Sequence, residues 1–173
     1  MPKTNFASLV STFMLCFGFW LLITWSLAPQ EMIAGAVISL AAAWFCGRFF
    51  IHAKPFYLFN PTKLLALKFY CLVTFPVELF KANWDMAKRA LSPNLNINPG
   101  IVKVPSELQS EYALSMLANS ITLTPGTITM DIAEQEGKNY YYIHWIDVSE
   151  TEREKAGDSI KGALESGIRR IWR

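Results

Sequence analysis

Charged side chains are scarce at the start of this sequence of 173 residues. Residues 1–60 contain four of them, which are Lys3, Glu31, Arg48 and Lys54. The other 113 residues hold 13 Lys or Arg and 13 Asp or Glu. A domain that folds in water needs charged groups over its surface, so this scarcity excludes an ordinary soluble first third. We expect these residues to lie in lipid.

The sequence also lacks the motifs of common enzymes. It contains no phosphate-binding loop, no H-E-x-x-H, no G-x-S-x-G and only two histidines. His144 falls in an alternating pattern typical of a strand, without an acid or nucleophile at a recognisable spacing, so we interpret it as a structural residue. We predict that the chain is not an enzyme and has no catalytic residue and no cofactor.

Cysteine is rare, and its three copies do not cluster. Cys16, Cys46 and Cys71 lie in three separate apolar stretches, without a C-x-x-C spacing or a neighbouring histidine. A metal or redox site needs ligands that converge, so we interpret these residues as small apolar side chains and predict no metal site.

A strongly basic C-terminal part is absent as well. Residues 1–99 have eight Lys or Arg and three Asp or Glu, whereas residues 100–173 have eight and eleven. The positive excess therefore accompanies the apolar stretches, where anionic lipid attracts it. The mildly acidic remainder offers no footprint for nucleic acid, which we exclude as a partner.

What the sequence does contain is two long apolar runs. Residues 9–27 carry no charge, and as a helix they would span about 28 Å, close to a hydrocarbon thickness of about 30 Å. Residues 32–51 follow a short turn and carry only Arg48, so the two runs predict a transmembrane hairpin. Small residues in the second run either let helices pack closely or simply favour helix. A signal peptide cleaved after Ala28 is the alternative for the first run, although its length exceeds the usual ~7–15 residues.

A third apolar stretch, residues 64–91, differs because it carries charges. They are Lys68, Glu78, Lys81, Asp85, Lys88 and Arg89, and Pro76 predicts a kink. The pattern fits either a third crossing or an amphipathic helix at the membrane surface, and the distribution of basic residues does not choose between them. Glu78 is a candidate functional carboxylate within the membrane, with neutralisation by Lys81 one turn away as the structural alternative. Lys68 could extend to the headgroups.

The C-terminal part is predicted to form a small α+β domain. Residues 92–100 are rich in Pro and Asn, which predicts a linker between a membrane domain, residues 1–91, and a polar domain, residues 101–173. Apolar periodicity in the polar domain predicts the order β-α-β-β-α. These elements are expected at residues 101–104, 107–119, 127–132, 140–148 and after 149.

Short signals mark the ends of these elements. Ser106 is expected to cap the first helix of the domain, and Ser149 with Glu152 forms a capping box before the last helix. The Pro-Gly pair at residues 125–126 suits a type II turn, and residues 136–138 suit the turn of a β-hairpin.

One extended string carries a resemblance to a known family. Residues 117–132 read LANSITLTPGTITMDI, and residues 142–147 read YIHWID. Together with the apolar hairpin and the P-x-E-L at residues 76–79, this string resembles the E subunit of the multisubunit Mrp-type (Mnh) cation/proton antiporters over the whole chain. The motif residues carried over are Asn119, Ser120, Thr122, Thr124, Pro125, Gly126 and Thr127.

The resemblance implies an accessory subunit of a hetero-oligomeric sodium/proton exchanger in a bacterial inner membrane, with the polar domain in the cytoplasm. Its partners would be the other membrane subunits and the bilayer, and the assembly would move sodium ions and protons in cation efflux and pH homeostasis. The motif would either satisfy its own backbone or dock a neighbouring subunit. The alternative function is a membrane-tethered protein-interaction module that is not involved in transport.

Overall fold

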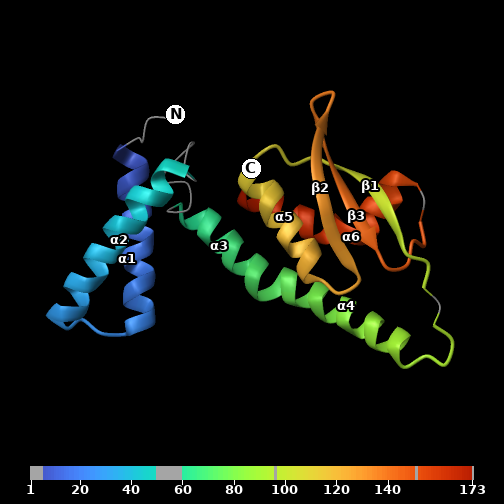
Figure 1. Cartoon of the computed structure of the whole chain (residues 1–173), viewed down its shortest axis with the longest axis horizontal. Helices are drawn as coiled ribbons and strands as arrows, with labels where there is room; N and C mark the ends of the chain where they lie inside the picture. The colour runs from blue at the N-terminus through green and yellow to red at the C-terminus, as the bar shows by residue number, and fades with distance from the viewer. Residues whose placement is uncertain (1–5, 50–59, 96, 151, 173) are drawn as a thin grey trace. The chain divides into compact units, whose positions relative to one another are not determined.

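The computed structural model describes residues 6–49, 60–95, 97–150 and 152–172, whose helices and strands are shown in Figure 1. By their contacts they fall into two compact units, residues 1–60 and residues 61–173. The predicted third helix therefore shares its contacts with the small α+β domain, although the sequence grouped it with the two apolar runs.

The first unit is a helical hairpin. α1, Phe6–Thr24, and α2, Pro29–Phe49, pack against each other, and both are long and apolar enough to cross a membrane. At the turn between them, Trp20 donates a hydrogen bond of 3.1 Å to the carbonyl of Glu31. This bond ties the end of α1 to the first turn of α2.

Small residues are buried in this hairpin and large ones are exposed. The buried residues are Ser8, Ser11 and Thr12 on α1 and Gly35, Ser39 and Ala43 on α2. Exposed large apolar side chains include Met14, Phe19, Leu22, Ile33, Val37 and Leu40. Folding in water would favour the opposite arrangement, so the outer surface of the hairpin suits lipid. The spacing of four residues on α2 favours a dedicated packing face over a mere preference for helix.

The second unit begins with one long helix in three parts. α3, Pro61–Phe69, continues into a π-helical turn, η2, Tyr70–Thr74, and then into α4, Phe75–Ala90. The N–H of Phe75 donates to the carbonyl of Tyr70, five residues before it. The kink predicted at Pro76 is replaced by this wide turn, which places the proline in the first turn of α4, where its missing N–H costs little.

The sheet of the second unit has three antiparallel strands in the order β1-β3-β2. Their bounds are Gly100–Ser106 for β1, Thr127–Gln135 for β2 and Lys138–Trp145 for β3. Tyr141 in the central strand pairs with Val104 of β1 and Ile132 of β2. Glu136 and Gly137 have φ values of 53° and 74°, as the tight turn of a β-hairpin requires.

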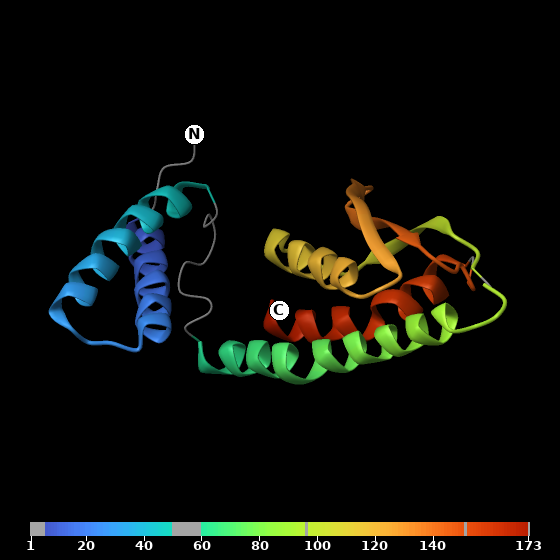
Figure 2. The ribbon, with the colours of Figure 1, turned by 60° about the horizontal axis from the view of Figure 1, so that its bottom comes forward.

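Two helices cover one face of this sheet. α5, Glu111–Leu123, contacts β2, and α6, Arg153–Ile171, contacts β1 and α5. The core between them contains Val104, Leu117, Ile121, Tyr141, Ile143, Leu164 and Ile168. Figure 2 shows α6 running beside the long helix, and α6 contacts all three of its parts. The unit is therefore layered as sheet, helix pair and long helix.

Both predicted helix caps of the domain are wrong. Ser106 ends β1, and α5 begins only after Ser110, because the Ser106 hydroxyl donates to the distant carboxylate of Glu165 instead of capping a helix. α6 begins after Glu152 and not after Ser149, and the Glu152 side chain makes no cap hydrogen bond in the described part of this segment. At Ser106, a tertiary partner replaced the local cap that the sequence offered.

Candidate functional site

The family motif forms the end of α5 and the entry to β2. Thr124 is the C-cap of α5 in an extended conformation, and Gly126 follows with a φ of 93°. A positive φ favours glycine, and a Cβ at Gly126 would also lie 3.1 Å from the Cε of Met86 on α4. The backbone conformation of the predicted Pro-Gly turn and the close approach of α4 thus both require a glycine at position 126.

The hydroxyls of Thr124 and Thr127 are buried and bond within the motif. The Oγ1 atoms of Thr124 and Thr127 lie 2.7 and 2.8 Å from the carbonyl oxygen of Ile121, and 3.1 Å from each other. The Oγ1 of Thr122 accepts a hydrogen bond of 3.2 Å from the N–H of Thr129. These bonds supply partners for the end of α5 and the start of β2, where the backbone has few others. The exposed Asn119 makes no such bond among the interactions described.

Ser120 connects the motif to the long helix. Its hydroxyl donates to the carbonyl of Met116 at 2.8 Å and accepts from the hydroxyl of Tyr70 at 2.6 Å. Tyr70 belongs to the buried core, and burial raises the pKa of its phenol, so the group remains a neutral donor. The motif therefore holds η2 as well as its own turn.

A pocket of about 310 Å³ lies between the motif turn and α4. Its lining includes Glu78, Lys81, Asp85 and Arg89 of α4, residues 124–127 of the motif, and Asp147 after β3. The structure thus brings together the two candidates singled out from the sequence, the motif and Glu78. Lys68 is exposed on α3 and does not line this pocket.

The acidic side chains of this pocket are paired with cations. The Nζ of Lys81 donates to the carboxylate of Glu78 at 2.7 Å, one turn away on α4. Arg89 bridges two elements, because its Nε donates to Asp85 and its Nη1 to Asp147, both at 2.8 Å. The hydrogen bond to Asp85, together with the one to Asp147, raises the pKa of Arg89 and keeps its charge fixed.

Sequence reasoning missed the link between Arg89 and Asp147. The two residues are 58 positions apart, and neither has a spacing that marks it. The only signal was that Asp147 closes the family string at residues 142–147. The link fastens the end of α4 to the chain that leaves β3.

This pocket suits the bracing of two elements better than chemistry. Its carboxylates already have cationic partners, and the motif hydroxyls have acceptors of their own. Among the described residues, no three His, Cys, Asp or Glu side chains gather as metal ligands would. His144 lies half-buried in β3, with Ile101 and Ile128 as its neighbours in register.

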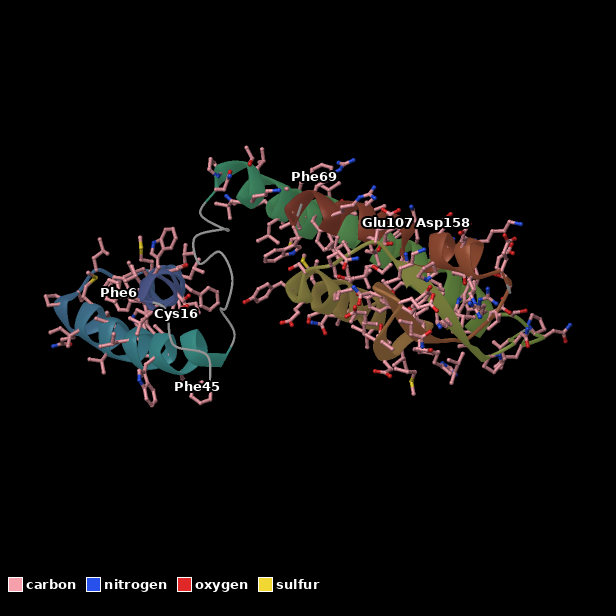
Figure 3. All side chains as sticks on the ribbon, turned by 90° about the horizontal axis from the view of Figure 1, so that it is seen from above. Phe6, Cys16, Phe45, Phe69, Glu107 and Asp158 are labelled. Carbon is pink, nitrogen blue, oxygen red and sulfur yellow. The ribbon has the colours of Figure 1, made fainter. Side chains whose placement is uncertain are left out.

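A second pocket, of about 640 Å³, lies between the end of β1 and α6. It contains a buried ion pair of Lys161 and Glu165 that the sequence did not reveal. Glu165 also accepts from the hydroxyl of Ser106 and, at 2.9 Å, from the N–H of Glu107. Glu107 and Asp158, which line this pocket, are labelled in Figure 3. The pair fixes α6 to the end of β1.

Comparison with known proteins agrees with the motif. Residues 13–171 match the model of a family described as Na+/H+ ion antiporter subunit. The E subunit of the Na(+)/H(+) antiporter of Bacillus subtilis is 35% identical over 154 residues, which cover 89% of this chain and 91% of that protein. The E1 subunit of the Na(+)/H(+) antiporter of Staphylococcus epidermidis is 34% identical over 152 residues, with coverages of 88% and 89%.

A solved structure shows the same fold. One chain in the structure of the membrane-bound sulfane sulfur reductase, an archaeal respiratory membrane complex, is 39% identical and superposes with a TM-score of 0.81. The similarity covers 95% of this chain and 99% of that one. Two apolar N-terminal helices, further helices and a three-stranded antiparallel sheet therefore form the fold of a membrane-complex subunit. The motif, the family model and the relatives agree, and the chain belongs to the family of Na+/H+ antiporter E subunits.

Proposed function

We propose that the chain is an accessory, assembly-type subunit of a multisubunit cation/proton antiporter, which supports sodium efflux and pH homeostasis. The observation that carries this proposal is how the polar side chains of the candidate site are bonded, in a chain that belongs to the E-subunit family. Its hydroxyls bond internally and its carboxylates are ion-paired, so the site joins elements and leaves no group poised to bind a transported ion.

The hairpin alone offers no ion path. An ion path needs ionisable or polar groups that face a water-lined route between helices. The surface between α1 and α2 is instead closed by small residues such as Ser11, Gly35 and Ala43. Transport therefore belongs to the other subunits, and this hairpin packs beside them.

The proposed topology places the polar domain in the cytoplasm. A hairpin brings its two ends to the same side of the membrane. Lys3, Arg48, Lys54 and Lys63 flank those ends, and basic flanks stay on the cytoplasmic side. Residues 1–91 would then contact lipid, and residues 101–173 would face water.

Reconstitution tests the accessory role. The tagged full chain should co-purify with the other antiporter subunits from membranes solubilised in mild detergent. Vesicles that hold the complete complex should exchange sodium for protons, and vesicles that hold this chain alone should not. Exchange by the chain alone would overturn the accessory role, and purification without any other subunit would overturn the assembly role.

A pair of threonine variants tests the role of the motif. Thr124→Ala removes a buried hydroxyl and should lower the melting temperature of the detergent-solubilised chain, because the end of α5 loses a partner. Thr122→Ala is the matched control at an exposed position of the same motif and should have the smaller effect. If Thr124→Ala keeps its stability but no longer co-purifies with the complex, the motif is a docking surface and the structural role is wrong.

A further inference from the structure

The long helix, residues 61–90, has two distinct faces. The face toward the domain holds Ala66, Leu67, Tyr70 and Phe75, which lie in or against the buried core. The opposite face carries a row of large side chains that we call the apolar stripe. Its members, with their exposed fractions, are Leu65 69%, Phe69 51%, Leu72 75%, Val77 47%, Phe80 70% and Trp84 58%. Phe69 is labelled in Figure 3.

The π-helical turn keeps both faces aligned along the whole length. In an uninterrupted α-helix, the positions after Leu72 on the same face would be 76, 79 or 80, and 83. The five residues of η2 add one residue to the turn, and the exposed positions become Val77, Phe80 and Trp84. The same shift keeps Leu79 and Met86 half-buried on the side toward the domain. The stripe is therefore continuous over α3 and α4.

The length of this helix and its contacts with α6 are both incompatible with a crossing of the membrane. Thirty residues would extend about 45 Å, which exceeds a hydrocarbon core of about 30 Å. α6 also runs beside all three parts of the helix, and a crossing would carry the charges of α6 into the hydrocarbon. Those charges are Arg153, Glu154, Lys155, Asp158, Lys161, Glu165, Arg169 and Arg170.

The charges of the long helix match an anionic surface. It has five basic and two acidic side chains, a net charge of +3, and both acids are paired within α4. Lys88 lies beside the stripe, with its Nζ 5.7 Å from the ring centre of Trp84, an arrangement suited to the boundary between lipid and water. Along the sequence, residues 50–60 alone separate the apolar hairpin from this helix.

We propose that residues 61–90 lie flat in the cytoplasmic boundary of the bilayer, with the apolar stripe among acyl chains and the exposed Lys68 and Lys88 among anionic lipid headgroups. The domain then stands on the membrane through this helix. The proposal rests on the membrane subunit role given above and deepens it, because it names lipid as the partner of this surface. All basic flanks of the chain, from Lys3 to Lys88, then share one side of the membrane.

Depth measurements test the proposal. The antiporter complex carrying the full chain, with Cys16, Cys46 and Cys71 replaced by Ala, is reconstituted into vesicles of phosphatidylcholine and phosphatidylglycerol. Single cysteines at Leu65, Leu72, Phe80 or Trp84 carry a fluorophore, and lipids spin-labelled at known depths quench it. A cysteine at Val37, exposed on α2, is the lipid control, and one at Ser166, exposed on α6, is the water control.

A flat helix places all four labels at one shallow depth, about 5–10 Å below the headgroups. A crossing helix would change the depth by about 1.5 Å per residue, or about 28 Å between Leu65 and Trp84, and that result would overturn the proposal. Quenching at Val37 with none at the four stripe positions would also overturn it, since water or another subunit would then cover the stripe.

A second measurement needs no substitution. A photoreactive phospholipid with its reactive group near the headgroup is added to the wild-type complex, and labelled peptides are mapped by mass spectrometry. Labels on the stripe and not on Leu67 or Leu79 support the proposal, and their absence from residues 61–90 overturns it. Co-purification of the other subunits is scored on the same preparation. Their loss with a labelled stripe would count against the accessory role alone.

Discussion

At the scale of single residues, the most demanding interaction is the buried pair of Lys161 and Glu165. Two charges taken out of water lose their hydration, and their mutual attraction compensates only when further hydrogen bonds satisfy the remaining lone pairs. Here the hydroxyl of Ser106 and the N–H of Glu107 complete the shell of the Glu165 carboxylate. The pair therefore fixes where α6 sits on β1.

Lys161→Met tests this interaction. The substitution keeps the length of the side chain but leaves the Glu165 carboxylate buried without a cation, so we expect the free energy of unfolding to fall by about 3–5 kcal/mol. Lys155→Met is the matched control, since Lys155, also on α6, pairs with Glu152 at the N-cap of this helix and both side chains are largely exposed. It should cost at most about 1 kcal/mol. Denaturant titration of the detergent-solubilised chain measures the free energy of unfolding of both variants. Equal losses would show that the buried pair stabilises the fold no more than the exposed one.

Buried phenols predict how stability depends on alkaline pH. Burial raises the pKa of Tyr70 and of Tyr141 above their ordinary value of about 10. Above about pH 10 the unfolded chain loses these protons while the folded chain keeps them, so stability falls as pH rises. Below pH 9 both phenols keep their protons in the folded and in the unfolded chain, so they do not make stability depend on pH.

Tyrosine variants isolate this effect. Tyr141→Phe should flatten the fall of the melting temperature between pH 9 and 11, although it also removes the hydrogen bond of 2.8 Å to the carbonyl of Leu114. Tyr142→Phe, which removes a hydroxyl bonded to Gln135 at the sheet surface, is the matched control and should leave the fall in place. An unchanged fall in Tyr141→Phe would contradict the role of burial.

Residue-scale features were predictable only where the chemistry is local. Gly126 could be foreseen because a Pro-Gly pair specifies its own turn. The link between Arg89 and Asp147 could not, since an ion pair across 58 residues leaves no periodic signal, and neither could the hydrogen bonds that Ser106 and Glu107 donate to Glu165. The cap predicted at Ser106 failed because its hydroxyl bonds to a distant carboxylate, and the one predicted at Ser149 failed because α6 begins after Glu152.

At the scale of elements, glycines set how closely helices approach. A Cβ on Gly167 would lie 2.8 Å from the ring of Tyr70, so this residue lets α6 lie against η2. Gly162 is five residues, or about 1.4 turns, earlier on α6, where a Cβ would meet only the side chain of Asp158 at 3.8 Å. Both glycines lie within the same α-helix, so the two positions differ in what an added Cβ would contact.

Gly167→Ala and Gly162→Ala should have opposite effects. The first overpacks the joint between α6 and the long helix and should lower stability by about 1–3 kcal/mol. The second removes a flexible residue from a helix and should raise stability by about 0.5–1 kcal/mol. Melting temperatures of the two variants measure the difference. A stabilising Gly167→Ala would mean that α6 does not pack on η2.

The hairpin gives a second pair of glycines. A Cβ on Gly35 would lie 2.4 Å from the ring of Trp20, whereas a Cβ on Gly18 would meet nothing within 4 Å. Gly35→Ala should push α2 away from α1 and destabilise the hairpin by about 1–3 kcal/mol, and Gly18→Ala should be neutral. Unfolding in mixed micelles, followed by tryptophan fluorescence, reports both. Equal stability of the Gly35→Ala and Gly18→Ala variants would argue against close packing at Gly35.

Element types were predictable, and their details were not. Apolar runs and alternating residues specified two N-terminal helices, a long third helix, three strands and a final helix. The π-helical turn had no such signal. Pro76 indicates an irregularity, but the extra residue sits where Tyr70 is held by Ser120, and that contact joins segments 50 positions apart.

At the scale of the whole molecule, the hairpin should do more than anchor the domain. Its exposed side chains, including Phe19, Leu22 and Trp44, form an outer surface that can contact neighbouring helices as well as lipid. The sequence could not show that the third helix belongs with the domain, because that grouping depends on a buried tyrosine within an apolar stretch.

Exchange of residues 1–60 for an unrelated two-helix hairpin tests this view. We expect the chimera to remain in the membrane fraction, since any apolar hairpin supplies the transfer free energy. It should no longer co-purify with the other antiporter subunits, and cells that depend on it should lose sodium resistance. A chimera that supports growth in sodium as the natural chain does would show that the hairpin is only an anchor.

The wide turn at Tyr70–Thr74 also indicates where this chain can change in length over time. Removing one of its five residues would close the turn to an ordinary α-helical one and leave Trp84 facing as it does now, because the wide turn accommodates one extra residue. Removing a residue between this turn and Trp84 would instead rotate the rest of α4 by about 100°. A gain or loss of one residue is therefore better tolerated at this turn than in the regular turns beside it.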